Sequence, residues 1–174
     1  MKKYAKVDVV VEPRANNVKF GKGVIVKDGC QLSNVIIGDN TRLGRNVTIF
    51  GARRKPVVIG KNCYIPYGCY FSGADGKNQI IIKDNVIFAP YCVILTSSGP
   101  CAPQVQSKLI NRFPQRTGSV VIEDDCWIMA RSTILPGVRL GREAAVAAHS
   151  LVKKSFKSSV LVGGVPAKII RSIR

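Results

Sequence analysis

The fold of this chain is decided by residues 122–157, which read IEDDCW-IMARST-ILPGVR-LGREAA-VAAHSL-VKKSFK when divided into blocks of six. Each block begins with Ile, Leu or Val, and no residue is inserted or missing between blocks. An α-helix repeats about every 3.6 residues and an ordinary strand every two, so neither period explains a spacing of six. A fixed spacing of this kind predicts a solenoid in which each block contributes one short strand.

The same spacing extends through most of the chain. Aliphatic or aromatic residues begin eighteen blocks, namely Phe20, Val26, Leu32, Ile37, Leu43, Ile49, Ile59, Ile65, Phe71, Ile82, Phe88, Ile94, Ile122, Ile128, Ile134, Leu140, Val146 and Val152. The spacing departs from six at four places, where it is 5, 10, 11 and 28 residues, and each departure follows a third block. We therefore expect an all-β fold of about six three-sided coils, a prism whose insertions all leave at one corner.

Two further positions in the block support this register. The fourth residue is often Gly, Asn or Asp, the types that most readily adopt the left-handed backbone conformation of a tight corner. The fifth residue is small or compact, and five of the six cysteines occupy it: Cys30, Cys63, Cys69, Cys92 and Cys126. Such a column predicts buried, apolar thiols rather than a disulfide framework. Cys101 lies outside the column, and its exposure and reactivity stay open.

Length and hydropathy set the domain organisation. A chain of 174 residues suits a single domain, with an N-terminal cap over residues 1–19, coils over 20–155 and a C-terminal cap over 156–174. One long loop, residues 96–121, interrupts the coils, and loops of this length in compact domains are usually functional or disordered. The longest apolar run, VIFAPYCVIL, is too short for a transmembrane helix, and the N-terminus MKKYAKVDVVVEP does not resemble a secretory signal. We expect a cytoplasmic protein.

The net charge of +17 predicts partners that carry negative charge, such as nucleic acid, anionic lipid headgroups, acidic glycans or phosphorylated cofactors. The basic residues are scattered, with local clusters at Arg53-Arg54-Lys55 and Lys153-Lys154. Nucleic acid is disfavoured because the sequence has no basic helix, zinc-finger spacing or RNA-binding aromatic motif. Peripheral contact with an anionic membrane and a merely solvated basic surface remain alternatives.

Several segments carry a family resemblance. The stretches IIGDNTRLGRNVTI, VIGKNCYI and VIEDDCWIMARSTILPGVRLGREAAVAAHSLVKK, followed by VGGVPAKIIRSI, resemble the hexapeptide-repeat acyltransferases. The resemblance covers about residues 18–172. Within the family, the sequence is similar to the galactoside, maltose and polysaccharide O-acetyltransferases. It implies a left-handed parallel β-helix, whereas the general rule for parallel crossovers would give a right hand. It also implies a homotrimer, acetyl-coenzyme A (acetyl-CoA) in a groove between neighbouring prisms, an acceptor site closed by the long loop, and a role in polysaccharide biosynthesis.

The resemblance further implies the residues that bind the cofactor. The family holds the pantetheine arm with backbone amides at the third position of two late blocks, which correspond here to Ala130 and Ala148. Basic residues after the last block meet the phosphates. Lys153 and Lys154 match this position, and Lys168 and Arg171 lie in the terminal segment GGVPAKIIR, so we expect these four cations to bind phosphate. The same terminal segment is expected to cap the open end of the solenoid.

The expected catalytic histidine is missing. Removing the proton of an attacking hydroxyl calls for a general base, and family segments such as ILTATHP place a histidine near the start of the long loop. Here residues 94–100 read ILTSSGP, so Gly99 occupies the histidine position. Residues 96–121 contain no His, Asp or Glu. Restoring the family residue with Gly99→His is expected to raise O-acetylation if the loop geometry survives.

Three residues are candidates for the missing catalytic role. Ser98 can position a ligand, and Cys101 is the readily titratable neutral group of the loop. The sole histidine, His149, occupies the fourth position of its block, where a corner residue with positive φ is the simpler interpretation. A single histidine also argues against the zinc-dependent carbonic anhydrases of the same fold, and we expect no metal site.

Three functions follow from these observations. The first is acetyl-CoA-dependent acetylation of a saccharide hydroxyl, with the base supplied from elsewhere. The second is N-acetylation of an amino sugar, whose neutral amine attacks without prior deprotonation. The third is a catalytically inactive trimer that binds coenzyme A or acts as a scaffold. The acceptor, a saccharide or a nucleotide- or lipid-linked sugar, is not identified, but the positive charge would suit an acidic one.

Overall fold

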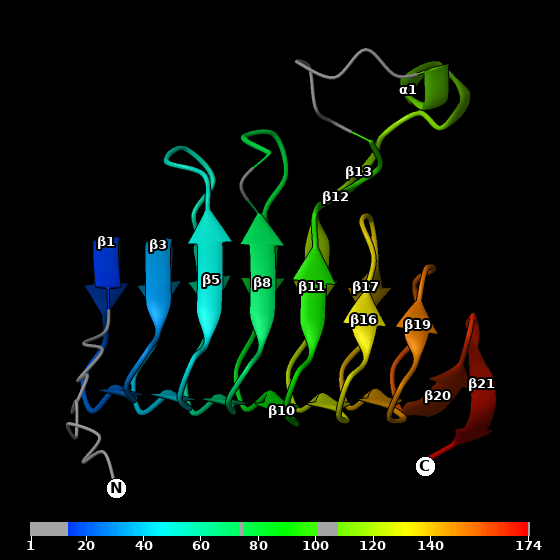
Figure 1. The fold of residues 1–174 in the computed structure, drawn as a ribbon. Helices are drawn as coiled ribbons and strands as arrows, with labels where there is room; N and C mark the ends of the chain where they lie inside the picture. The colour runs from blue at the N-terminus through cyan, green and yellow to red at the C-terminus, as the bar shows by residue number, and fades with distance from the viewer. Residues whose placement is uncertain (1–13, 74, 101–107, 174) are drawn as a thin grey trace, which may run out of the picture.

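The computed structural model describes residues 14–73, 75–100 and 108–173, which form a three-sided coil of short parallel strands (Figure 1). Residues predicted to begin equivalent blocks lie opposite each other in successive coils. Phe20 opposes Ile37, Ile37 opposes Ile59, and Ile122 opposes Leu140. The chain is therefore a parallel β-helix, and the register predicted from the six-residue spacing is confirmed.

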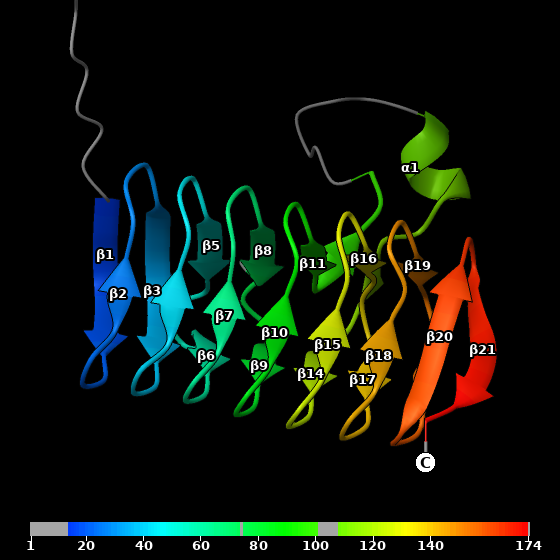
Figure 2. The same cartoon turned by 90° about the horizontal axis from the view of Figure 1, so that it is seen from below.

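The strands form three faces around the prism axis, and within each face successive strands stack along that axis (Figure 2). The first face contains β6 (Val57–Ile59), β9 (Ile80–Ile82), β14 (Val120–Ile122) and β17 (Arg139–Leu140). The second contains β2 (Ile25–Val26), β4 (Arg42–Leu43), β7 (Tyr64–Ile65), β10 (Ile87–Phe88), β15 (Trp127–Ile128), β18 (Ala145–Val146) and β20 (Val160–Gly164). The third contains β5 (Thr48–Gly51), β8 (Tyr70–Gly73), β11 (Val93–Leu95), β16 (Thr133–Ile134) and β19 (Leu151–Val152).

Two longer strands belong to two faces at once. β3 (Gln31–Ile37) pairs with β5 on the third face through its first half and with β6 on the first face through its second half. β1 (Arg14–Phe20) pairs with β3 along its length and adds a layer at the N-terminal end. The spacing of five between Leu32 and Ile37 explains this continuity, because no inserted residue interrupts the strand where it crosses between faces.

Three edges separate the faces. The first edge joins the first face to the second, the second edge joins the second face to the third, and the third edge joins the third face to the first. Along the first two edges, the fourth residue of each block has positive φ: Gly23, Gly29, Asn40, Asn46, Asn62, Gly68, Asn85, Tyr91, Asp125, Arg131, Glu143 and His149. The expected left-handed corners are confirmed, and the coil imposes them even on Tyr91, Arg131 and Glu143.

The core is a column of inward-facing apolar side chains. The block starts Phe71, Phe88 and Ile122 are buried, and the rings of Phe71 and Phe88 lie 5.0 Å apart between centroids. The five column cysteines are also buried and free. Burial raises the pKa of the Cys126 thiol to about 12 and that of Cys63 to about 11, so these thiols are un-ionised at neutral pH. The interpretation of the column as compact core filler is confirmed.

The described insertions leave at the third edge. Chain segments after β5, β8 and β11 project from the same side of the prism, and the last of them is the longest (Figure 1). It begins with β12 (Ser97–Ser98), contains α1 (Lys108–Arg112) and returns through β13 (Arg116–Thr117). The position predicted for the long loop is therefore confirmed.

The coil register continues beyond the last predicted block. Phe156 forms a parallel bridge with Leu140, and Val162 in β20 opposes Val146. β21 (Ala167–Ser172) then reverses direction and pairs antiparallel with β20. The C-terminal segment thus adds a partial coil before it closes the second face. Among the described residues, the structure contains no helix of the length and apolarity required to cross a membrane.

Candidate functional site

The second edge places Ala130 and Ala148 in adjacent coils. Ile128 opposes Val146, so the residues that follow these two stack at the same corner, and the amide of His149 donates to Ala130 O at 2.9 Å. The amides of the preceding residues Met129 and Ala147 donate to carbonyls of the next coil. Within the described residues, the amides of Ala130 and Ala148 have no such partner. The edge therefore presents two N–H groups in line, each able to donate to a bound ligand.

The terminal strand brings Lys168 to this edge and leaves Arg171 farther away. Lys168 opposes Gly163, and a Cβ added to Gly163 would lie 2.9 Å from the Cβ of Ala147, so this layer packs directly on the coil that carries Ala148. Arg171 opposes Leu161, nearer the middle of the second face. Lys168 and Arg171 are both exposed.

Lys153 and Lys154 lie at a different edge. They follow β19 and lead to Phe156 at the third edge, so the full width of the third face separates them from Ala148. Both side chains are exposed, and Lys154 Nζ lies 5.6 Å from the centroid of the Phe156 ring. Within one chain, the structure therefore separates the four predicted phosphate-binding cations: Lys168 lies at the second edge, Arg171 on the second face, and Lys153 and Lys154 at the third edge.

His149 is an exposed corner residue with φ of 56°, as expected. The equivalent corner in the coil before holds Arg131, whose guanidinium lies 5.6 Å from the centroid of the Tyr91 ring. Tyr91 in turn meets Tyr67 edge to face, with centroids 5.0 Å apart. His149 thus ends a ladder of large side chains on the second edge, and the third face separates it from the base of the long loop at the third edge.

The base of the long loop is a short antiparallel stalk. Thr96 is buried, and both its amide and its hydroxyl donate to Ser72 O, at 3.0 and 3.3 Å. The stalk pairs Ser97 with Thr117 and Ser98 with Arg116. The candidate Ser98 is therefore half-buried in a strand pair, and its neighbour across the pair is an arginine.

Gly99 follows the stalk with φ of 146°, a conformation that residues with side chains rarely adopt. A Cβ at this position would lie 2.8 Å from the Cα of Gln115, which is backbone and cannot rotate away. The observed loop conformation therefore requires a residue without a side chain at position 99. The expectation that Gly99→His restores a base needs correction, because the present loop geometry does not accommodate histidine.

Asp75 is a carboxylate near the loop that sequence reasoning missed. It lies in the insertion after β8, and its oxygens accept hydrogen bonds from the Asn78 side chain at 2.9 Å and from the amides of Asn78 and Lys77. Burial raises the pKa of Asp75, but hydrogen bonds from Asn78 and Lys77, together with the nearby Thr96 side chain, outweigh it and hold the pKa below its ordinary value. The available signal was positional: Asp75 is the acidic residue of an insertion that shares the third edge with the long loop.

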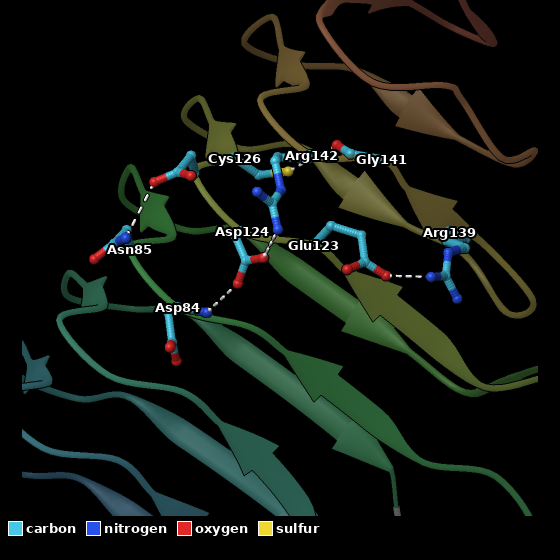
Figure 3. A network of polar contacts seen from close by, with 9 residues as sticks. Asp84, Asn85, Glu123, Asp124, Cys126, Arg139, Gly141 and Arg142 are labelled. Atoms are coloured by element: carbon cyan, nitrogen blue, oxygen red, sulfur yellow. Dashed lines mark hydrogen bonds and ion pairs between the residues drawn. The ribbon is translucent and has the colours of Figure 1, made fainter.

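Carboxylates on the first edge form contacts between successive coils. Asp124 accepts a hydrogen bond from the amide of Asp84 at 3.1 Å and pairs with Arg142 at 2.9 Å (Figure 3). The Asn85 side chain donates to Asp125 at 3.1 Å. Each of these contacts joins successive coils, so this acidic ladder links the layers and leaves its carboxylates on the edge away from the long loop.

Two remaining predictions concern reactive or metal-binding groups. Cys101, a predicted candidate, lies outside the described residues. Among the described residues, no group of three His, Cys, Asp or Glu side chains is arranged to hold a metal ion. The described residues of the site therefore supply amide donors, hydroxyls, cations, the Asp75 carboxylate and the His149 imidazole.

Comparisons with known proteins agree with this architecture. A family model described as "Bacterial transferase hexapeptide (six repeats)" matches residues 119–154, and one described as "Hexapeptide repeat of succinyl-transferase" matches residues 34–70. A galactoside O-acetyltransferase of Lactococcus lactis is 29% identical over 133 residues, which cover 66% of this chain and 62% of that protein. The chain therefore spans less than two thirds of that relative's length.

Two solved structures share the fold. A hexapeptide-repeat containing acetyltransferase of Vibrio cholerae, solved with acetyl coenzyme A, is 25% identical, with a TM-score of 0.55 over 95% of this chain and 73% of its own. A mutant of AntD, an N-acyltransferase from Bacillus cereus solved with dTDP and coenzyme A, is 22% identical, with a TM-score of 0.72 over 91% and 85%. Fold and register define a hexapeptide-repeat left-handed β-helix. Together with the matched repeats, they identify a hexapeptide-repeat protein that is similar to the acyltransferases built from such repeats.

Proposed function

We propose that this protein transfers an acetyl group from acetyl-CoA to a hydroxyl of a saccharide. The observation that carries the proposal is the pair of amides of Ala130 and Ala148, which stack in adjacent coils without a carbonyl partner among the described residues. Two aligned N–H donors suit the amide oxygens of a pantetheine arm. The similarity to hexapeptide-repeat proteins named as acetyltransferases supports the same activity.

The residues present fit the cofactor. Ala130 and Ala148 would hold the pantetheine arm, and Lys168, which lies on the layer above Ala147, would meet a phosphate. The cofactor would supply the acetyl group as a thioester. Lys153, Lys154 and Arg171 remain proposed phosphate ligands, and the separation of the two lysines from Ala148 across the third face means that they would serve a different part of the cofactor or a neighbouring subunit's site.

A homotrimer would complete this site. The three faces of the prism are flat sheets, and a ligand cleft beside such a face has to be closed by a loop or a second subunit. A hollow of about 560 Å³ at the C-terminal end is lined by Arg139, Ser155 and Phe156 among others, so it lies away from Ala130 and Ala148. We propose that neighbouring prisms form the groove and that the long loop of one closes the site of another.

The transfer forms a bond between the acceptor oxygen and the acetyl carbon and breaks the carbon–sulfur bond, so the hydroxyl proton has to leave with a base. Residues 96–121 supply no His, Asp or Glu. Ser98, Cys101 and His149 remain proposed participants. His149 lies at the opposite edge of the third face from Ser98, so it could act on an acceptor at that loop only from a neighbouring subunit.

The second candidate function is N-acetylation of an amino sugar. The loop favours it, because a neutral amine attacks a thioester without prior deprotonation and the Gly99 backbone excludes a histidine. The fold likeness to an N-acyltransferase agrees with this candidate. On either reaction we propose a cytoplasmic enzyme of glycan or polysaccharide biosynthesis, with a free, nucleotide-linked or lipid-linked sugar as acceptor.

Thiol release from acetyl-CoA tests the proposal. The full-length chain would be supplied with matched pairs of sugars that differ in one group, such as glucose and glucosamine, and free thiol would be followed spectroscopically. Release with hydroxyl-only sugars supports O-acetylation, and release with the amine alone supports the second candidate. Tight coenzyme A binding without release from a broad panel would instead identify an inactive binding or scaffold protein and overturn the proposed enzyme.

A further inference from the structure

Charge is distributed unevenly over the three edges. The described parts of the three loops on the third edge carry one carboxylate, Asp75, and seven basic side chains: Arg53, Arg54, Lys55, Lys77, Lys108, Arg112 and Arg116. The ion pairs among described residues lie elsewhere and join Asp28 to Arg45, Asp39 to Lys61, Glu123 to Arg139 and Asp124 to Arg142. The positive charge of the third edge is thus left available to a ligand.

The first of these loops is a tight hairpin that displays two arginines. Ala52 and Lys55 exchange two backbone hydrogen bonds, from Ala52 N to Lys55 O at 3.2 Å and from Lys55 N to Ala52 O at 3.0 Å. Arg53 and Arg54 occupy the turn between them, and both are exposed. Because these two hydrogen bonds fix the backbone of the turn, the Cα atoms of both arginines have defined positions at the surface.

A polar hollow of about 410 Å³ lies beside the hairpin and is lined by Arg53, Asn16, Asn17 and Asn34. Two of the asparagines are held in place: Asn17 Nδ2 donates to Asn34 Oδ1 at 2.7 Å, and Asn34 Nδ2 donates to Gly51 O at 2.9 Å. Amides and a guanidinium offer donors and acceptors for sugar hydroxyls and a planar fork for a carboxylate or phosphate. A hollow of this volume falls within the usual range of small-molecule sites.

We propose that the arginine hairpin and the asparagine-lined hollow beside it bind an acidic unit of an extended saccharide, at a site separate from the cofactor edge. This inference rests on the proposed saccharide acceptor. The hairpin belongs to the second coil and the long loop to the fourth, about 10 Å farther along the axis at the usual strand spacing. A linear acidic glycan could therefore occupy the hollow while a unit farther along the same chain lies at the long loop.

The shape of the site favours a saccharide over a membrane. A bilayer surface presents charge in a plane and rewards apolar side chains that enter it. The hollow is concave, and its lining is polar throughout. The exposed side-chain amides of Asn16 and Asn17 would meet hydroxyls of a sugar ring, whereas lipid headgroups would leave these amides without a specific role.

Calorimetric binding of oligogalacturonate to the full-length protein tests the site, with the fully methyl-esterified oligomer as the matched uncharged ligand. The wild type should bind the acidic form at least about tenfold more tightly, since hydrogen bonds to charged groups contribute at this level. The difference should shrink as salt is added, because the site is exposed. Arg53→Ala with Arg54→Ala should abolish the preference, and Arg53→Lys with Arg54→Lys should retain part of it.

Lys27→Ala with Lys83→Ala is the control, because it removes the same charge from exposed positions away from the hairpin. This control should keep the preference, and coenzyme A binding by each variant reports that the coil is intact. Equal binding of the two oligomers by wild type, or an equal loss in the control, would overturn the site. Binding to phosphatidylserine vesicles that depends on Arg53 and Arg54, without oligogalacturonate binding, would assign the patch to a membrane instead. Failure of thiol release with every acceptor is a separate result that bears on the proposed enzyme alone.

Discussion

The coils and the long loop of this protein use side chains in opposite ways. In the coils, each inward position recurs in the next layer, so Phe71 opposes Ile94 and each layer supports its neighbours. In the long loop, one antiparallel stalk supports residues with exposed side chains, including Phe113. The comparison teaches that repetition makes the scaffold stable, whereas the candidate chemistry depends on single positions that no repeat constrains.

The largest expected difference between the two regions is in stability. Phe71→Ala should lower the free energy of unfolding by about 3–5 kcal/mol, because it leaves a cavity beside Phe88 in a fully buried column. Phe113→Ala is the matched control, since Phe113 is 61% exposed in the loop, and it should change stability by less than about 0.5 kcal/mol. Urea unfolding followed by circular dichroism measures both. Similar losses for the two variants would mean that the loop is part of the cooperative core.

The next effect concerns the loop backbone. Gly99→His should not raise O-acetylation and should strain the stalk by about 1–3 kcal/mol, because φ at Gly99 is 146° and a Cβ would lie 2.8 Å from Gln115 Cα. Hydrogen exchange of the stalk amides should therefore accelerate. Ser98→His offers the comparison, since Ser98 precedes the strained position and does not have positive φ. A clear gain in turnover from Gly99→His with unchanged exchange would contradict this account.

The repeat made the coils predictable from sequence, and its absence made the loop unpredictable. Block starts such as Ile37 and Ile122 repeat in kind, so spacing alone fixed their register and their burial. Gly99 could be aligned with the family histidine from sequence. The steric conflict that a side chain would cause there could not, because it depends on the contact with Gln115 across the stalk. Asp75 could not be predicted as part of this site, because its proximity to Thr96 results from the shared edge and not from nearness in sequence.

Amide donors on the second edge provide a smaller and more selective test. Ala130→Pro and Ala148→Pro should each weaken coenzyme A binding about tenfold by removing one N–H. Proline is compatible with this backbone position, because Pro90 occupies the equivalent place one coil before Ala130. Arg45→Pro changes the same position in the second coil, remote from the proposed groove, and should leave affinity unchanged. Titration calorimetry measures all three; an equal loss in the Arg45 variant would point to a general effect on the coil.

The smallest effect should be a loss of hydrogen-exchange protection at acid pH in the segment around Asp75. Hydrogen bonds hold the pKa of Asp75 below its ordinary value, so the carboxylate stabilises the folded segment above the unfolded pKa of about 3.9. That contribution is lost as pH falls through the lower, folded pKa, when protonation removes an acceptor from Asn78 and Lys77. Hydrogen exchange of these two amides should therefore show an added protection loss at acid pH. Asp75→Asn should exchange faster at neutral pH and lack this acid step. If the step persists in Asp75→Asn, another group controls the segment and the link between Asp75 and the base of the long loop is wrong.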